Sequence, residues 1–456
     1  MEVTGRRIVV VGAARSGLAA AELLSSRGAE VIVTDVREDV ENRDKLEAIG
    51  VKLELGIQRQ ETLMGADLIV LSPGVSPYQP DVAAAKRAGV DVIGEVELAS
   101  RWLKGKLVAI TGTKGKSMTT VLAKRMLESG GFKVLVGGNI GQALSTQVSA
   151  STPDVVHLVE VSSFQLEQTY TFRPFIGVCL NIFSDHLDRH GSMQAYAEAK
   201  GRIFTNQKNT DWAVVNADDP RSLELADRGQ AKLLRFSMRG TFLDEGIVIA
   251  NDFVVYRTGQ RDVPLIPLSA INLLGQHLVG GVLAAASVSM LLGVTAEQMT
   301  SAVEGYTGLE HVLEPVAEIK GVRFVNDSKA TNIEAVRRSV ESFDGDVVVI
   351  MGGRFKGGNL RELRPVLGER AVAVFAIGEA RPLISQALGD VVPVSAVEGM
   401  AEAVRSAYAA VPQDGIVLLA PACASFDMYR DYAERGKNFK DEVKCLALEL
   451  NSRREQ

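Results

Sequence analysis

A glycine- and lysine-rich segment at residues 111–117, TGTKGKS, has the residue types that bind the phosphates of a nucleotide. Glycines let backbone N–H groups close around phosphate oxygens, and the N-terminus of a following helix adds positive charge. In this pattern the lysine before the final serine reaches the β- and γ-phosphates, and the serine hydroxyl binds Mg²⁺. The generic pattern has a further glycine where Ile110 stands, but an apolar strand before the loop and a helical pattern after it favour nucleotide binding over a structural loop. The candidate ATP-binding residues are Gly112, Thr113, Lys114, Gly115, Lys116 and Ser117.

Two more polar groups follow apolar runs that come after this loop. Glu160 lies near the end of the run VVHLVEV, where an acid can meet the magnesium ion of the nucleotide. A carboxylate in that place can equally be a helix cap or a surface charge. His186 lies in the polar segment SDHLDRH and is either a metal or substrate ligand or part of a solvated loop.

The N-terminal loop at residues 12–17, GAARSG, follows the apolar run RIVVV. A nicotinamide-binding loop has a glycine where Ala14 stands, because the pyrophosphate must approach the backbone closely. Asp35 ends the second apolar run, in the place where Rossmann proteins hold ribose. The loop is therefore a weak match to NAD and is compatible with another diphosphate, such as a UDP-sugar.

The last third of the chain has three polar segments. Two of them directly follow an apolar run, and the third surrounds a lysine in a glycine-rich turn after another apolar run. They are NDSKATN at residues 326–332, the loop around Lys356 in MGGRFKGGN, and PACASFD at residues 421–427. The carboxyl ends of parallel strands meet at one edge of a doubly wound sheet. We therefore expect the three segments to converge on one crevice.

The elements that position these residues follow from the alternation of short Val/Ile runs with Ala/Leu-rich helical patterns. This alternation predicts an α/β fold of parallel sheets covered on both faces by helices. A β-rich stretch at 236–263 predicts a small antiparallel addition, and the apolar segment 280–296 predicts a buried helix, because it is short for a membrane span. The predicted domains are an N-terminal Rossmann-like domain at 1–100, a central P-loop ATPase-type parallel sheet at 101–308, and a C-terminal Rossmann-like domain at 309–456.

Composition excludes several classes of protein. A formal net charge of −6 argues against a sequence-independent nucleic-acid binder, which needs a basic face. Three widely spaced cysteines fit a reducing compartment better than a disulfide framework or a zinc site. The N-terminus lacks the charged and apolar regions of a signal peptide. We therefore expect a cytoplasmic protein with no nucleic-acid partner and no membrane insertion. We also expect a monomer, although no residue pattern determines the oligomeric state.

Taken together, the motifs resemble those of the Mur ligases, and within that family the branch that adds D-glutamate to UDP-N-acetylmuramoyl-L-alanine. The resemblance covers essentially the whole chain. It is carried by LSPGVSP at 71–77, TGTKGKS, GGNIG at 137–141, EVSSFQLE at 160–167, SDHLDRH, NDSKATN and PACASFDMYRDYAERG. EVSSFQLE and PACASFD are specific for the D-glutamate-adding branch, whereas the phosphate loop is shared across the superfamily, including the folylpolyglutamate synthases.

The resemblance implies an ATP-dependent ligase that forms an acyl phosphate in peptidoglycan precursor synthesis. It implies two Mg²⁺ ions held by Ser117, Glu160, His186 and Lys200. Lys200 matches the family's carbamylated lysine, whose CO₂ adduct is a carboxylate and can bind Mg²⁺, whereas the residue pattern alone indicates a solvated helix lysine. The catalytic candidates are Lys116, His186, Lys200 and Lys329.

The same resemblance assigns substrate contacts in all three predicted domains. Two lysines facing a dicarboxylic amino acid are electrostatically favourable. The D-glutamate contacts are Lys329, Thr331, Lys356, Ser425 and Phe426, and His277 and Asp327 join the ATP contacts, Asp327 at the ribose. The contacts to the UDP-substrate are Ser16, Asp35, Arg37, Ser72, Gly74, Asn139, Ser162 and Gln165.

Several positions depart from the family's pattern. Leu278 and Gly281 replace two asparagines that help to hold the adenine. Val312 stands where an arginine usually follows the hinge histidine His311, and Met118 stands where a small hydroxyl residue is usual. We therefore expect weaker or altered ATP binding.

Three alternative functions follow from the residues. A sister ligase that adds another amino acid is disfavoured by the PACASFD segment. A weakly active or non-catalytic nucleotide-binding paralogue is suggested by the departures from the family's pattern, but the retained phosphate loop, acid, histidine and lysine favour catalysis. An NAD-dependent oxidoreductase is suggested by the repeated Rossmann-like patterns but lacks a complete dinucleotide fingerprint.

Overall fold

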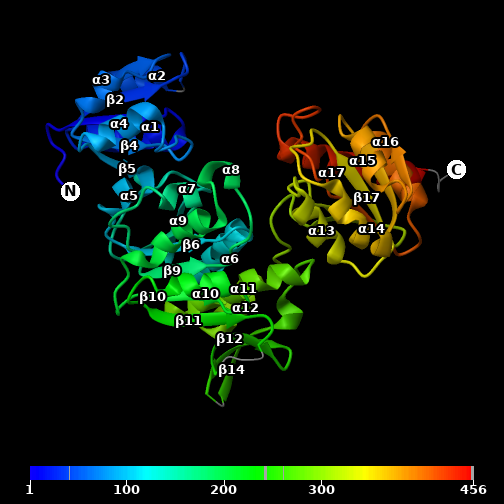
Figure 1. Ribbon diagram of the computed structural model, residues 1–456. Helices are drawn as coiled ribbons and strands as arrows, with labels where there is room; N and C mark the ends of the chain where they lie inside the picture. Colours follow the sequence, from blue (N-terminus) through cyan, green and yellow to red (C-terminus); the bar gives the residue numbers. More distant parts are fainter. Residues whose placement is uncertain (41, 241–243, 260, 453–456) are drawn as a thin grey trace. The chain divides into compact units, whose positions relative to one another are not determined.

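The computed structural model describes residues 1–40, 42–240, 244–259 and 261–452, in which three β-sheets are each accompanied by helices (Figure 1). This arrangement confirms the α/β prediction. The chain forms two compact units, Met1–Ala270 with Gly280–Glu304, and Ile271–Val279 with Gly305–Gln456. The first unit contains two of the sheets and the second contains the third, and the bounds of the three domains stay a prediction.

The first sheet is parallel and has the strand order β3-β2-β1-β4-β5. Its strands form because continuous Val/Ile/Leu runs can be buried on both faces. The chain moves to one side of β1 and then returns to the other, so β1 and β4 flank the switch point where α/β sheets bind ligands. Its elements are β1 (Arg7–Val11), α1 (Arg15–Ser26), β2 (Glu30–Asp35), α2 (Arg43–Ala48), β3 (Lys52–Leu55), α3 (Gln60–Met64), β4 (Leu68–Leu71), α4 (Pro80–Arg87), β5 (Asp91–Gly94) and α5 (Glu95–Ser100).

The second sheet has the order β14-β13-β12-β11-β10-β9-β6-β8-β7. Its strands are parallel from β7 to β12, and β12, β13 and β14 pair antiparallel, which confirms the predicted antiparallel addition. The strands are β6 (Lys106–Thr111), β7 (Lys133–Gly138), β8 (Val155–Glu160), β9 (Ile176–Cys179), β10 (Trp212–Asn216), β11 (Lys232–Ser237), β12 (Glu245–Ala250), β13 (Phe253–Thr258) and β14 (Arg261–Pro267). The helices are α6 (Lys116–Ser129), α7 (Ser163–Leu166), α8 (Leu187–His190), α9 (Met193–Thr205), α10 (Pro220–Ala226), α11 (Gln276–Leu291) and α12 (Ala296–Val303).

Helix α11 contains most of the apolar segment 280–296 that was predicted to be a buried helix, up to Leu291, and the structure confirms that prediction for this part. Val282 and Leu283 are fully buried, as are the alanines that follow them. The hydroxyls of Ser287 and Ser289 donate to the carbonyls of Leu283 and Ala285, so these buried groups are paired within the helix. None of the helices in the described part of the chain combines the length and the apolar character that a membrane span requires.

The third sheet has the order β15-β16-β20-β17-β18-β19, with only β15 antiparallel to its neighbour. Strand β20 lies between β16 and β17, so the loops that follow these three strands leave the same edge of the sheet side by side. The strands are β15 (Glu314–Ile319), β16 (Val322–Asn326), β17 (Val347–Gly352), β18 (Ala371–Ile377), β19 (Val394–Ala396) and β20 (Ile416–Leu419). The helices are α13 (Ile333–Glu341), α14 (Arg364–Arg370), α15 (Arg381–Leu388), α16 (Met400–Ala410) and α17 (Tyr432–Ser452).

Candidate active site

The phosphate loop joins β6 to the N-terminus of α6, as its sequence predicts. Gly112 has a φ of +150° and Gly115 a φ of +85°, and a Cβ on Gly112 would lie 2.9 Å from the Cβ of Leu180. The loop therefore requires glycine at the first of these positions for both backbone freedom and close packing. Its N–H groups lead into the first turn of α6, where the helix end adds positive charge.

Asn181 fixes this loop, and the sequence analysis missed it. Its Oδ1 accepts from the backbone N–H groups of Thr113 and Lys114 at 3.1 and 2.9 Å, and its Nδ2 donates to the Lys114 carbonyl at 3.1 Å. Asn181 follows β9, which pairs directly with β6. A polar residue directly after a strand of the same sheet was the signal that could have identified it.

Two lysines meet at one carbonyl oxygen of the phosphate loop. Lys116 Nζ donates to the Gly112 carbonyl at 3.0 Å and to that of Thr113 at 3.1 Å. Lys200 Nζ, from α9, donates to the same Gly112 carbonyl at 2.9 Å, and the Lys200 residue is only 2% exposed. The pattern-based interpretation of Lys200 as a solvated lysine is therefore wrong, because α9 turns this side chain towards the loop.

The surroundings of Lys200 change its acidity. Burial, and secondarily the charge of Lys116, lower its pKa from 10.5 to about 7. The Nζ also lies 4.8 Å from the centre of the Tyr196 ring, whose hydroxyl contacts Thr113 Oγ1 at 3.1 Å. A lysine with this pKa is partly a neutral amine at pH 7, which is the form that acts as a nucleophile.

Glu160 ends β8 and is 1% exposed, which excludes the surface-charge interpretation. Asn139 Nδ2 donates to Glu160 Oε1 at 2.6 Å. Its Oε2 is buried and has no hydrogen-bond partner among the described residues. A buried carboxylate oxygen without a donor is costly unless a cation compensates it. Glu160 therefore fits the role of a metal ligand beside the phosphate loop. Ser117, another predicted ligand, is half-buried in the first turn of α6.

His186 is the N-cap residue of α8. It is exposed, has a φ of +54°, and its ring centre lies 4.9 Å from that of Phe164. Within the described residues no recorded interaction joins it to Glu160 or Lys200. The structure thus brings Lys116 and Lys200 together, and the charge of Glu160 acts on Lys200. The assignment of all four residues as metal ligands stays a prediction.

A second group of contacts in the same unit involves residues 160–167 and residues 186–190. Ser162 and Gln165 form a capping box at the start of α7, directly after β8. Arg189, which the sequence analysis missed, donates to the carbonyls of Pro73 and Val75 at 3.1 and 3.2 Å. These two carbonyls flank Gly74, so Arg189 fixes the loop that carries a predicted UDP-substrate contact.

The predicted UDP-substrate residues of the first sheet lie around its switch point. Asp35 accepts from the N–H of Ala13 at 2.7 Å and from Arg37 Nε and Nη2 at 3.0 and 2.9 Å. These bonds, those from Arg37 first, hold the pKa of Asp35 at about 2. Ser72 Oγ donates to the Gly12 carbonyl at 2.8 Å, which joins the loops after β1 and β4. Of the other two predicted contacts, Ser16 is buried in α1 and Gly74 is exposed.

The three polar segments of the second unit do converge, as predicted. Ala422 N–H donates to the Ala330 carbonyl at 3.0 Å, and the N–H of Arg354 donates to the Ala424 carbonyl at 2.8 Å. Asp327 is buried, which raises its pKa to about 6, and accepts from the hydroxyl of Ser339. The predicted D-glutamate contacts differ in exposure. Lys329, Lys356 and Phe426 are exposed, Thr331 is half-buried, and Ser425 is buried.

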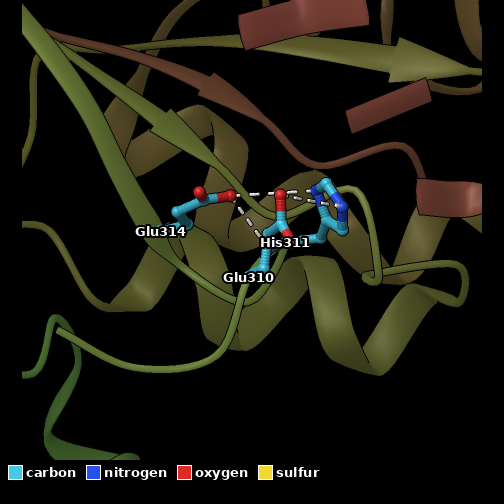
Figure 2. Close-up of side chains that lie close together, drawn as sticks. All are labelled: Glu310, His311 and Glu314. Atoms are coloured by element: carbon cyan, nitrogen blue, oxygen red, sulfur yellow. Dashed lines mark hydrogen bonds and ion pairs between the residues drawn. The ribbon is translucent and has the colours of Figure 1, made fainter. Parts of the chain in front are cut away.

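Figure 2 shows a second group of potential metal ligands, Glu310, His311 and Glu314, whose ligand atoms lie within 4.8 Å of one another. Lys440 Nζ donates to Glu314 Oε1 at 3.0 Å and also bonds Glu310. Asn326 Nδ2 lies 2.9 Å from His311 Nδ1. The Lys440 ammonium therefore offsets part of the charge of both carboxylates, and the group is an ion-pair network within the second unit.

Two of the departures from the family pattern are in contact. Met118 is buried, and a Cβ on Gly281 would collide with its Cε and lie 2.9 Å from Thr119 Oγ1. The methionine thus occupies the space beside the glycine, so the two changes compensate each other in packing. The side chain of His277 lies outside the described residues, and Leu278 is buried.

Comparison with known proteins gives matches along the whole chain. The descriptions "Mur ligase MurD-like, N-terminal domain", "Mur ligase middle domain" and "Mur ligase, glutamate ligase domain" match residues 6–94, 110–289 and 313–423. The UDP-N-acetylmuramoylalanine–D-glutamate ligase of Acidobacterium capsulatum is 43% identical over 448 residues, 97% of each chain. The enzyme of the same name from Koribacter versatilis is 41% identical over 450 residues, 98% of this chain and 99% of that one.

Solved structures share the fold at low sequence identity. A pseudomurein peptide ligase type C from Methanothermus fervidus has a TM-score of 0.60 and 18% identity, covering 97% of this chain and 100% of that one. A MurF ligase from Thermotoga maritima in complex with ADP has a TM-score of 0.60 and 17% identity, covering 98% and 97%. These likenesses support the three-domain architecture.

Proposed function

Because this chain belongs to the Mur ligase family, we propose that it adds D-glutamate to UDP-N-acetylmuramoyl-L-alanine with ATP, in peptidoglycan precursor synthesis. Relatives about 40% identical over nearly the full chain carry that name. The observation in the structure that carries the proposal is the meeting of Lys116 and the buried Lys200 at the Gly112 carbonyl, in the phosphate loop. We also propose that the protein works as a monomer in the cytoplasm.

In this proposal the phosphate loop binds ATP through residues 112–117. The backbone N–H groups of the loop and of the first turn of α6 surround the phosphates. The Lys116 ammonium moves from the carbonyls of Gly112 and Thr113 to the β- and γ-phosphates, where it offsets negative charge. Asp327 in the second unit and His277 are the further ATP contacts that the family pattern suggests, the first of them at the ribose.

Mg²⁺ fits the residues beside the phosphate loop. The buried, unpaired Oε2 of Glu160 supports a cation there, and we assign Ser117, His186 and a carbamylated Lys200 as the other ligands. When bound, Mg²⁺ offsets the charge on the transferring phosphoryl group. The two ions of the family pattern and the carbamate remain part of the proposal.

The lowered pKa of Lys200 supports its carbamylation. The neutral amine attacks the carbon of CO₂, a nitrogen–carbon bond forms, and one proton is released, which leaves a carbamate with one negative charge. A pKa of about 7 makes the neutral amine abundant at neutral pH. The adduct converts a buried cation into an anion, which removes the repulsion between Lys200 and Lys116.

The reaction then proceeds in two steps. An oxygen of the L-alanyl carboxylate attacks the γ-phosphorus, the bond to ADP breaks, and an acyl phosphate forms. The D-glutamate amine attacks the acyl carbonyl, loses a proton, and phosphate leaves with the carboxylate oxygen that it received. Lys329 and Lys356 bind the carboxylates of D-glutamate, with Thr331, Ser425 and Phe426 around them, and the UDP-substrate is held by residues at the switch point of the first sheet together with Asn139, Ser162 and Gln165.

The test is phosphate release with ATP and UDP-N-acetylmuramoyl-L-alanine across a panel of D- and L-amino acids. Only D-glutamate should stimulate release. Stimulation by a different amino acid would identify a sister ligase, and binding of ATP without any stimulation would identify a non-catalytic paralogue. A titration that detects NAD(H) binding in place of ATP binding would contradict the assignment altogether.

A further inference from the structure

Arg435 is a fully buried cation at the start of α17, only 1% exposed. Its Nε donates to Ser328 Oγ at 3.0 Å and its Nη2 to the Ser328 carbonyl at 2.9 Å. Its Nη1 donates to the carbonyls of Gly352 at 3.2 Å and Cys423 at 3.1 Å. All the hydrogen bonds recorded for this guanidinium therefore go to backbone carbonyls or a hydroxyl.

The partners of Arg435 belong to three different loops. Ser328 lies in the loop after β16, Gly352 ends β17, and Cys423 lies in the loop after β20. These strands are neighbours in the sheet, so one guanidinium joins three adjacent strand ends. A guanidinium has five N–H donors in a rigid plane, which lets it fix three carbonyls in a defined arrangement.

Packing alone does not explain an arginine at this position. Arg435 lies on the same buried side of α17 as Phe439, Val443 and Leu446, which are apolar. Burying a charge costs free energy that an apolar residue on this stripe would not cost. Burial lowers the pKa of Arg435 to about 10, so the side chain still carries its charge at neutral pH.

The loop after β20 contains backbone strain that needs a restraint. Ala422 has a φ of +59°, in the left-handed region that a residue with a Cβ seldom adopts. Its N–H bonds the Ala330 carbonyl, and the next residue accepts from Arg435. The arginine thus holds the strained residue against the loop after β16.

These three loops carry the candidate contacts to the amino acid. Lys329 directly follows Ser328, Lys356 lies four residues beyond Gly352, and Ser425 lies two residues beyond Cys423. We propose that Arg435 is a positioning residue of the amino-acid site, which sets the spacing of these loops and adds fixed positive charge that favours a dicarboxylic amino acid. This inference rests on the proposed function.

The test compares two variants with a surface control. Arg435→Lys keeps a charge but has all its donors on one nitrogen, so it cannot reproduce the bonds that the three guanidinium nitrogens make. Ser328→Ala removes only the Ser328 hydroxyl, which accepts from Arg435 Nε and donates to the Tyr432 carbonyl at 2.7 Å. Arg430→Lys, an exposed arginine seven residues after Cys423, is the control. The measurements are the KM for D-glutamate, the kcat, and formation of the acyl phosphate, trapped with hydroxylamine in the absence of amino acid.

We expect Arg435→Lys to raise the KM for D-glutamate about tenfold or more, and Ser328→Ala to raise it by less. At saturating ATP the hydroxylamine-trapped product should form at the wild-type rate in both, because the phosphate loop is intact. A KM for D-glutamate that is unchanged in both variants, with only a lower Tm, would overturn the inference. If Arg435→Lys does not fold, the KM of Ser328→Ala decides. Failure of the proposed function differs visibly, because the wild type itself would then release no phosphate with D-glutamate.

Discussion

The second and third sheets each bury one cation against backbone carbonyls at their carboxyl edge, and the two cations differ in kind. Lys200 bonds the Gly112 carbonyl, and its pKa falls to about 7. Arg435 bonds the carbonyls of three loops, and its pKa falls only to about 10. The lysine can lose its proton and react, whereas the arginine stays charged. A buried lysine therefore suits a site where the side chain itself reacts, and a buried arginine suits a site where the side chain holds loops in a fixed arrangement.

The largest effect should come from the residue that shares the Gly112 carbonyl with Lys200. Lys116→Ala removes the ammonium that we propose offsets charge on the β- and γ-phosphates, so phosphate release should fall by about a thousandfold or more. Lys124→Ala, on the same helix in an exposed pair with Glu128, is the matched control and should be nearly wild type. Near-normal turnover in Lys116→Ala with an intact fold would contradict the role of the loop.

Replacing Lys200 by arginine tests the comparison between the two buried cations. Lys200→Arg keeps a charge but cannot form a carbamate, so activity should fall by about a hundredfold or more. Lys200→Ala should be equally impaired and should recover in part with added acetate or formate, which supply the missing carboxylate. Lys208→Arg, an exposed lysine just beyond the end of α9, is the control. Full activity in Lys200→Arg would refute the carbamate.

These residues also show what could be read from sequence. The alternation of strands and helices, the strand–loop–helix context of residues 111–117 and the meeting of the three C-terminal segments follow from patterns along the chain, and the structure confirms them. The burial of Lys200 could not be predicted from the sequence, because it depends on how α9 packs against β6 and β9. Asn181 and Arg435 act on backbone carbonyls and N–H groups, which no residue pattern marks. An arginine in line with Phe439 and Val443 on an apolar helix stripe was the available signal.

A smaller effect concerns the buried carboxylate of the third sheet. Burial raises the pKa of Asp327 to about 6, above its ordinary 3.8. Between pH 4 and 6 the folded state keeps a proton that the unfolded state has lost, so this group's contribution to stability falls as pH rises. Asp327→Asn should therefore gain free energy of unfolding relative to wild type between pH 4 and 7, by about 3 kcal/mol at most. Denaturant titrations at pH 4 and pH 7 measure this, and Asp346→Asn, at an exposed residue directly before β17, serves as the control. An equal difference at both pH values would show that Asp327 does not titrate in this range.

The central claim is that the carboxylate of one substrate becomes an acyl phosphate before the amide forms. The most direct measurement uses UDP-N-acetylmuramoyl-L-alanine with ¹⁸O in both oxygens of its carboxylate, together with ATP and D-glutamate. One carboxylate oxygen should leave with each phosphate, so the released phosphate should carry one ¹⁸O per turnover and the amide should keep the other. Phosphate free of ¹⁸O, released in step with D-glutamate addition, would contradict the account.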